Sequence, residues 1–151
     1  MSKINMLALD IATSCGWCTE NDSGVWNFAK QKRADSYGIR LLRLKAKLKE
    51  MIEANDINVV VYERPAGMFK SSIMVASEMV SVVIVMCEEM GLDYTAYSAS
   101  EIKKFWTGKG NANKQAMIDE TQKRYPELKI QTDDQADAIA LYHLAKKDLK
   151  L

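Results

Sequence analysis

Ile4-Asn5-Met6-Leu7-Ala8-Leu9-Asp10 is the stretch that decides the fold class of this 151-residue chain. The apolar run over 4–9 predicts a central β-strand that is covered on both faces, with Asp10 directly after it. The run over 57–62, Ile-Asn-Val-Val-Val-Tyr, predicts a second buried strand, and Glu63 follows it. A carboxylate at the end of a buried strand is costly unless a cation meets it. These two runs therefore predict a sheet and a functional site at one end of it.

Further strands and helices are predicted on either side of these runs. Turn-forming residues over 21–24 predict a hairpin with strands over 17–20 and 25–28. Ser36 can cap a helix whose apolar positions recur at helical spacing up to Ile52. The remaining predicted elements are a helix over 71–90, a strand over 92–97, and helices over 99–106, from Asn113 to Tyr125 and from Thr132 onward. This order predicts an α/β fold with a mixed, partly parallel five-stranded sheet and helices on its faces.

Length and composition fit one domain spanning 1–151. The chain is 48% hydrophobic and 27% charged, which is ordinary for a globular protein. We expect it to be cytoplasmic, because no basic stretch with a small-residue cleavage site stands at its start. The apolar segment over 73–90 is interrupted by Ser77, Glu78 and Glu88, so we expect a buried or interface helix and no membrane partner.

Positive charge is unevenly distributed, although the net charge is only +1. One basic cluster comprises Lys30, Lys32, Arg33, Arg40, Arg43, Lys45, Lys47 and Lys49, and a second comprises Lys103, Lys104, Lys109 and Lys114. Such asymmetry can form a basic face beside an acidic pocket. The alternative for the first cluster is a set of solvated lysines on an amphipathic helix.

Cys15-Gly16-Trp17-Cys18 has the spacing of redox and zinc motifs. If both cysteines lie on one strand, their odd offset points them to opposite faces of the sheet, where they cannot easily bridge. A zinc site would need further ligands, and Cys87 and His143 lack a matching spacing. We therefore predict structural roles for Cys15, Cys18 and His143.

Asp134 and Asp137 lie one helical turn apart and belong to a helix that opens with the capping-box pattern of residues 132–135. If the strands that precede Asp10 and Glu63 are parallel neighbours, all four acids can meet at one edge of the sheet. A favourable interaction with the helix dipole is the alternative for the acids of the first turn. Oxygen ligands suit Mg²⁺ or Mn²⁺, and two such ions about 4 Å apart can activate a water and stabilise the leaving oxygen of a phosphodiester.

The helix over 71–90 is apolar on two stripes. One stripe contains Ile73, Ala76, Val80, Val83 and Cys87, and the other contains Met79, Val82, Met86 and Met90. One stripe can pack on the sheet and leave the other to a second copy, which predicts a homodimer through this helix. The alternative is that both stripes are covered within the monomer.

The chain resembles the RuvC-like Holliday junction resolvases of the RNase H-like superfamily, in particular their smaller bacteriophage members. The resemblance runs from Leu7-Ala8-Leu9-Asp10 through Val61-Tyr62-Glu63-Arg64-Pro65 to Asp134-Gln135-Ala136-Asp137 and the apolar residues that follow. It implies an RNase H-like fold and a homodimeric, Mg²⁺-dependent endonuclease that cuts two strands of a four-way DNA junction in recombination and repair. It also implies a bacterial host cell as the location if the protein is phage-encoded.

The resemblance implies roles for individual residues. Asp10, Glu63, Asp134 and Asp137 match the metal-binding, catalytic acids of the family. Lys103 and Lys114 match its phosphate-contacting lysines, and Lys114 is expected to act in catalysis as well. The expected DNA-binding set also contains Arg64, Phe69, Lys70, Lys104 and Lys109, with Phe69 as the aromatic wedge against the bases. Ile11-Ala12 stand where bacterial members usually carry Pro-Gly.

Three other functions compete with this one. Leu9-Asp10-Ile11-Ala12-Thr13-Ser14 is similar to the first phosphate loop of actin-like ATPases and sugar kinases, but those proteins need two such domains, and Gly108-Lys109-Gly110 lacks the spacing of a P-loop. A non-catalytic junction-binding module would be expected to lose acids, and all four are present. A nuclease acting on RNA:DNA hybrids or flaps is the alternative that the sequence excludes least.

Overall fold

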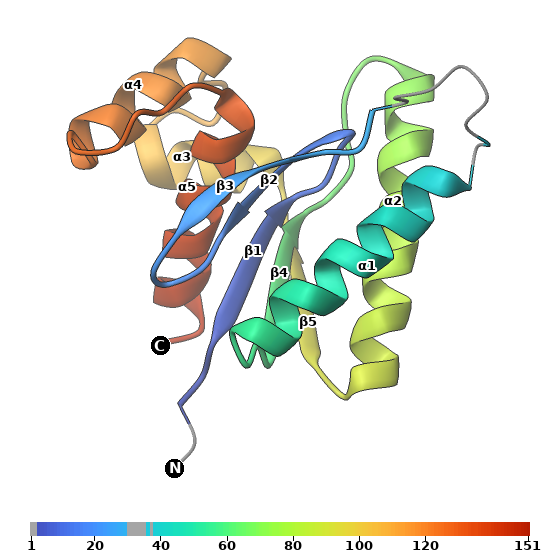
Figure 1. Cartoon of the computed structure of the whole chain (residues 1–151). Coiled ribbons are helices and arrows are strands. Elements are labelled where there is room, and N and C mark those ends of the chain that lie inside the picture. Colours follow the sequence, from blue (N-terminus) through green and yellow to red (C-terminus); the bar gives the residue numbers. More distant parts are fainter. Residues whose placement is uncertain (1–2, 30–35, 37) are drawn as a thin grey trace.

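The computed structural model describes residues 3–29, 36 and 38–151, and it arranges them as one sheet between two layers of helices (Figure 1). The strands are β1 (Met6–Asp10), β2 (Ser14–Cys18), β3 (Ser23–Asn27), β4 (Val59–Glu63) and β5 (Asp93–Tyr97). The helices are α1 (Ile39–Ala54), α2 (Lys70–Met90), α3 (Ala99–Thr107), α4 (Lys114–Arg124) and α5 (Asp133–Asp148). The predicted α/β class and the number of strands are confirmed.

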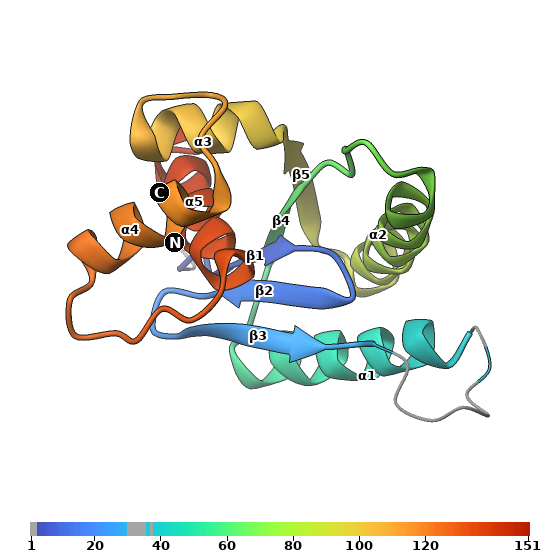
Figure 2. The same ribbon diagram turned by 90° about the horizontal axis from the view of Figure 1, so that it is seen from above.

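The sheet is mixed, with the strand order β3-β2-β1-β4-β5. β1, β4 and β5 run parallel, whereas β2 and β3 form an antiparallel hairpin that pairs with the other edge of β1. Figure 2 shows α1 and α2 on one face and α3, α4 and α5 on the other. The predicted helices on both faces are therefore confirmed.

β1 is apolar throughout because each of its faces enters a separate core. Leu7 and Leu9 pack with the residues of α1 and α2, while Met6 and Ala8 pack with those of α3, α4 and α5. All four are buried, with exposed fractions of 2% or less. A strand that is covered on both faces gains stability from every apolar side chain, which explains why its sequence does not alternate.

The two cysteines of the C-x-x-C motif point to opposite faces of β2. Cys15 packs in the core under α1 and α2, and Cys18 packs in the core under α5. Both thiols are free and buried. The expected packing of these cysteines is therefore observed.

The predicted limits of the hairpin were wrong. The strands cover 14–18 and 23–27 instead of 17–20 and 25–28, and the turn between them is closed by a hydrogen bond from the Thr19 N–H to the Asp22 carbonyl of 2.8 Å. The low strand propensity of residues such as Gly16 explains why the sequence places the start of the first hairpin strand at residue 17, three residues after its start at Ser14. Pairing with β1, which sets Gly16 opposite Asp10, makes this segment a strand.

The starts of α1 and α5 differ in detail from the predicted caps. The cap residue of α1 is Gly38, and Ser36 contributes only its carbonyl, which accepts a hydrogen bond from the Ile39 N–H at 3.2 Å. Thr132 does cap α5, accepting from the Gln135 N–H at 3.3 Å, but the Gln135 side chain does not return to the cap. It donates instead to the Ser23 hydroxyl at 3.1 Å, because β3 lies within its reach.

The two apolar stripes of α2 do not correspond to an inner and an outer face. The buried residues are Met79, Val80, Val83, Met86 and Cys87, so members of both stripes face the core. The apolar residues that stay exposed on this helix are Met74, Val85 and Met90. By length and composition α2 could cross a membrane, as no other helix of the described residues could, although one such helix is weak evidence and five of its residues are buried in the core.

Gly16 allows α5 to approach the sheet closely. A Cβ atom built on Gly16 would lie 1.8 Å from the Asp134 carbonyl oxygen and 2.4 Å from its carbon, which are backbone atoms that cannot swing away. The first turn of α5 therefore rests directly on the backbone of β2. A residue with any side chain at this position would push the helix off the sheet.

We expect Gly16→Ala to lower the free energy of unfolding by about 1–3 kcal/mol or more, because the new methyl group overlaps the backbone of α5. Urea unfolding followed by circular dichroism measures this change. Gly38→Ala is the matched control, because no heavy atom lies within 4 Å of a Cβ at Gly38. Equal stability of the two variants would contradict the close approach of α5.

Candidate metal centre

β1 and β4 bring Asp10 and Glu63 to the same edge of the sheet. The two strands are parallel neighbours whose register pairs Leu9 with Tyr62, and each strand ends at its acid. Asp10 is 9% exposed and Glu63 is half-buried. The expected meeting of the two acids follows from strand register alone.

α5 adds Asp137 to this pair. One carboxylate oxygen from each of Asp10, Glu63 and Asp137 can be chosen so that all three atoms lie within 4.8 Å of one another. Three carboxylates at this spacing can share one hard divalent cation, and open positions would remain for water and a phosphate. Among the described residues, this cluster is the one with the geometry of a metal site.

The electrostatics of the cluster favour a bound cation. Burial and then the neighbouring carboxylates Glu63 and Asp137 raise the pKa of Asp10 well above its usual value. Burial and Glu63 raise the pKa of Asp137 to about 8. The buried Oδ1 atom of Asp137 also has no hydrogen-bond partner among the described residues. An orphaned oxygen among like charges fits a divalent metal, which would satisfy both the oxygen and the charge.

Asp134 lies beside this cluster and is held by a residue of the hairpin. Its Oδ2 atom accepts a hydrogen bond from the Ser14 hydroxyl at 2.9 Å, and its oxygens are not part of the three-carboxylate group. Burial raises the pKa of Asp134, and hydrogen bonds with Ser14 and Asp10 act in the opposite direction. Asp134 therefore stands next to the three-carboxylate group, while β2 supplies a hydrogen-bond donor to one of its oxygens.

Ser14 and Asp133 are polar residues of this site that sequence reasoning did not identify. For Asp133, in the first turn of its helix, the sequence indicates only an interaction with the helix dipole, but its charge raises the pKa of Asp10, Glu63 and Asp137. Its position next to Asp134 is the one feature of the sequence that could have indicated a place near the site. Ser14 lies 120 positions from Asp134 in the sequence, and no local pattern connects them.

Lys103 and Lys114 lie close enough to act on the acids. Lys103 of α3 lowers the pKa of Glu63 and of Asp137, although burial dominates both groups. Lys114, the first residue of α4, lowers the pKa of Asp134 in the same way. α3, α4 and α5 pack against one another in one layer, which holds both lysines on helices that contact α5.

The other expected DNA-binding residues are solvent-exposed. Arg64 directly follows β4 and donates to the Ala96 carbonyl at 3.4 Å. Phe69 precedes α2 and is 71% exposed. Lys70, Lys104 and Lys109 are exposed as well. Of the first basic cluster, Lys30, Lys32 and Arg33 lie outside the described residues, and the other five belong to α1.

The family of the chain follows from comparison with known proteins. The family model described as crossover junction endodeoxyribonuclease RuvC matches residues 19–143. The chain belongs to the RuvC family. The matched range includes Glu63, Asp134 and Asp137, and it begins after Asp10. None of the curated proteins matches the sequence.

Solved structures of RuvC proteins share the RNase H-like fold of the chain. Thermus thermophilus RuvC in complex with a Holliday junction substrate has a TM-score of 0.72 at 17% identity, over 92% of this chain and 90% of that chain. Another Thermus thermophilus RuvC structure has a TM-score of 0.70 at 16% identity, over 97% of both chains. The yeast mitochondrial Holliday junction resolvase has a TM-score of 0.60 at 15% identity, over 91% of this chain and 77% of that chain.

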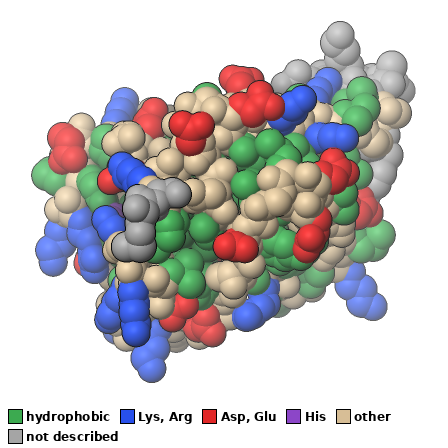
Figure 3. Space-filling model, turned by 90° about the horizontal axis from the view of Figure 1, so that it is seen from below, with side chains coloured by type: hydrophobic (Ala, Val, Ile, Leu, Met, Phe, Trp, Pro, Cys, Tyr) green, Lys and Arg blue, Asp and Glu red, His purple; other side chains and the backbone are tan. Residues whose placement is uncertain are grey.

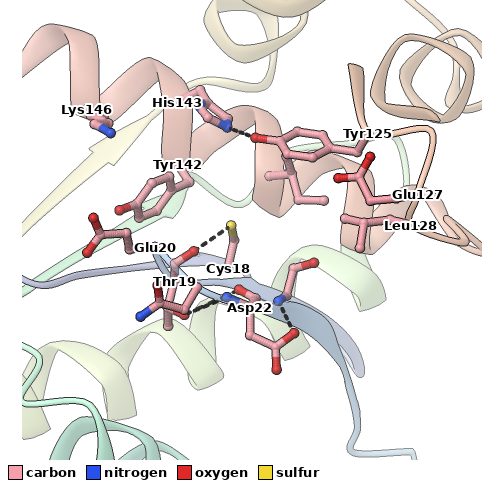
Figure 4. Close-up of a pocket in the computed structure, with 13 residues that line it drawn as sticks. Cys18, Thr19, Glu20, Asp22, Tyr125, Glu127, Leu128, Tyr142, His143 and Lys146 are labelled. Carbon is pink, nitrogen blue, oxygen red and sulfur yellow. Dashed lines mark hydrogen bonds between the residues drawn. The ribbon is translucent and has the colours of Figure 1, made fainter. Parts of the chain in front are cut away.

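A separate cavity of about 240 Å³ lies between the β2–β3 turn and α5 (Figure 4). Cys18, Tyr125, Tyr142 and His143 are among its lining residues, and the four acids are not. The Tyr125 hydroxyl and His143 Nε2 are 2.5 Å apart, and the His143 ring stacks on Trp106 with centroids 5.4 Å apart. His143 thus joins α5 to α3 and to the end of α4, which agrees with the structural role expected for it.

We expect Asp137→Asn to stabilise the metal-free protein at high pH. The folded-state pKa of Asp137, about 8, lies above its ordinary value, so its contribution to stability is complete at low pH and is lost as pH rises through about 8. The Asn variant lacks this loss and should exceed the wild type by about 1–3 kcal/mol near pH 9, with the difference shrinking towards about pH 5.

Urea unfolding in the presence of a chelator measures the effect, with Asp119→Asn on the exposed side of α4 as the control. Addition of Mg²⁺ should stabilise the wild type more than the Asp137→Asn variant, because the variant lacks one carboxylate. A variant that is less stable than the wild type over the whole pH range would contradict the proposed repulsion.

Proposed function

We propose that this RuvC-family protein is a divalent-metal-dependent endonuclease that resolves four-way DNA junctions as a homodimer. The observation that carries the proposal is the convergence of Asp10, Glu63 and Asp137 at one edge of the RuvC fold. Thermus thermophilus RuvC, which has the same fold, was solved with a Holliday junction substrate. The presence of all the acids argues against a non-catalytic junction-binding module.

The metal would be held by Asp10, Glu63 and Asp137, with Asp134 beside them. When bound, Mg²⁺ or Mn²⁺ ions, two per site in this proposal, supply an activated water and stabilise the leaving oxygen of a phosphodiester. The oxygen-only donor set supports these hard ions over zinc. The half-buried setting of the carboxylates limits the water around them and so strengthens their attraction for a cation.

Lys103 and Lys114 would bind the phosphate next to the scissile bond. Their influence on the pKa of the acids supports this position. In the proposed mechanism Lys114 also offsets the negative charge that develops during cleavage, while Arg64, Lys70, Lys104 and Lys109 bind the DNA backbone farther away. Cations in these positions make affinity depend on salt, because each phosphate contact releases counterions.

Phe69 would contact the bases of the junction. It is 71% exposed and stands beside Met68, which is 93% exposed, in the loop that connects β4 to α2. A large apolar pair in water at the acidic edge of the sheet is unfavourable unless a partner covers it. Unpaired bases at a junction offer such a partner, because aromatic rings stack on bases irrespective of sequence.

The apolar surface between α1 and α2 would form the dimer interface. A groove of about 430 Å³ is lined there by Leu41, Lys45, Glu78, Ser81, Val82, Val85, Met86 and Glu89. Leu42 of α1 and Met74 of α2 are also exposed, with exposed fractions of 62% and 60%. Figure 3 shows hydrophobic side chains gathered on the side of the molecule where α1 and α2 lie, with charged residues around them. The core of an interface with a polar rim has this composition.

Incubation with Mg²⁺ and labelled four-way junction, linear duplex, flap and RNA:DNA hybrid tests the proposed activity. We expect paired, symmetric cuts confined to the junction. Asp10→Asn and Asp137→Asn should reduce the rate by more than the roughly 10- to 100-fold that changes around a metal site cost. Asp119→Asn, a change of the same kind on an exposed helix surface, should leave the rate unchanged.

Other outcomes select the alternative. Equal cutting of the hybrid or the flap would favour another RNase H-like nuclease, which is the second candidate function. Cleavage that survives Asp10→Asn or Asp137→Asn would contradict the assigned centre altogether.

The dimer is tested with Val85→Asp, which places a charge in the proposed interface at a site that is 53% exposed in the monomer. We expect the wild type to sediment as a dimer at micromolar concentration and the variant as a monomer with unchanged circular dichroism. Leu128→Asp, an equally polar change at a residue 37% exposed on the other face, is the control. Met86 is unsuitable for this test, because it is 4% exposed and belongs to the core. A monomeric wild type would refute the dimer.

A further inference from the structure

The hydrogen bond from Ser14 to Asp134 connects the hairpin to the acidic edge of the sheet. Ser14 is the first residue of β2, and Asp134 is the second residue of α5. The Ser14 Oγ atom lies 2.9 Å from Oδ2 of Asp134, and both residues are partly buried. A partly buried hydroxyl-to-carboxylate hydrogen bond is stronger than a neutral one and fixes the side-chain torsions of the acid.

This hydrogen bond is not needed to attach α5 to the sheet. The helix already rests on the backbone of Gly16, and Gln135 donates to the Ser23 hydroxyl at 3.1 Å. Thr132 caps its first turn. α5 is buried on more than one side, with Ala136, Ala138 and Ala140 among its buried residues, and it packs against β1 and β2 as well as α3 and α4. The Ser14 hydroxyl adds little to this attachment, so its effect is expected on the carboxylate.

The Ser14 hydroxyl limits how the Asp134 carboxylate can turn. Asp133 precedes it on α5, and Asp10 stands opposite Gly16 in the sheet, where the Asp134 backbone contacts β2. Repulsion between like charges favours a rotamer that points a carboxylate to solvent. The hydrogen bond of 2.9 Å holds Oδ2 against this tendency, so the carboxylate stays at the edge of the sheet where Asp10 lies.

We infer that Ser14 is a positioning residue of the metal centre, whose hydroxyl holds the Asp134 carboxylate beside Asp10 so that it can take part in binding a divalent cation. This inference rests on the proposed function, because it assigns Asp134 to the same metal site. It adds a residue of the hairpin to a site otherwise built from β1, β4 and α5. Removal of such an orienting group around a metal site costs metal affinity more than it costs fold stability.

Three variants test the role of Ser14. Ser14→Ala removes the hydroxyl, Ser14→Thr retains it on a residue that suits a strand, and Ser23→Ala removes the comparable hydrogen bond to Gln135 one residue along α5. Mn²⁺ and Mg²⁺ binding is measured by calorimetry without DNA, and junction cleavage is measured as a function of Mg²⁺ concentration. Urea unfolding gives the stability of each variant.

We expect Ser14→Ala to weaken Mn²⁺ binding about 10-fold and to raise the Mg²⁺ concentration for half-maximal cleavage by a similar factor. The cleavage rate at saturating Mg²⁺ should stay close to that of the wild type, because mass action restores the bound form. Ser14→Thr should bind as the wild type does. Ser23→Ala should leave metal affinity unchanged, even if it lowers stability as much as Ser14→Ala.

Unchanged metal affinity in Ser14→Ala, or an equal loss in Ser23→Ala, would overturn the inference and leave a purely structural hydrogen bond. Failure of the proposed function gives a different pattern. In that case metal affinity responds to Ser14→Ala as expected, but the wild type cuts no junction. If the wild type cuts junctions and Ser14→Ala binds metal as tightly as the wild type does, the inference alone is wrong.

Discussion

The close approach of α5 to β2 at Gly16 is the constraint on which the rest of this structure depends. A glycine without Cβ sits opposite Asp10 in the sheet and lets the Asp134 backbone touch the strand. The axial position of α5 is set by this contact, and so Asp137 reaches the acids that end β1 and β4. A helix displaced by the width of a methyl group would carry its carboxylates away from the strand ends. The backbone contact at Gly16 and the register of β1 and β4 therefore place the acids of the site near one another.

The assembled site is unfavourable for the folded chain by itself. Like charges approach one another in a partly buried place, burial raises their pKa values, and one oxygen of Asp137 lacks a hydrogen bond. The two apolar cores that clamp the sheet offset this cost. Lys103 and Lys114 lower the pKa of these acids, and among the described residues neither forms an ion pair with them; in the proposed function their ammonium groups bind a phosphate. The same arrangement that weakens the metal-free fold strengthens its attraction for a divalent cation.

The two faces of the molecule are used differently. The face of α3, α4 and α5 supplies two acids and two lysines to the edge of the sheet, and its packing includes the stack of Trp106 on His143. The face of α1 and α2 is covered by helices whose outer side still exposes Leu42, Met74 and Val85. In the proposed function, the acidic edge of the sheet holds DNA while the apolar surface of α1 and α2 joins a second copy.

The sequence by itself determined the class of the fold and singled out the acids at the ends of its buried strands. The apolar runs predicted buried strands that are each followed by a carboxylate, and helical spacing placed Asp134 and Asp137 on one turn. Local rules also predicted that helices begin at Asn113 and Thr132, which cap α4 and α5 in the structure, because the start of a helix depends on residues within one turn.

Only the tertiary structure decided which acids converge and which residues support them. Local patterns cannot report contacts between residues 120 positions apart, so the Ser14 to Asp134 hydrogen bond was invisible in the sequence. The sequence shows Gly16 only as a member of a C-x-x-C motif, whereas in the structure α5 rests on its backbone. The division of α2 into an inner and an outer stripe fails for the same reason. A helix that is apolar on two sides does not reveal which residues the sheet and α1 will cover. Periodicity fixes what a segment can bury, and packing against distant segments fixes what it does bury.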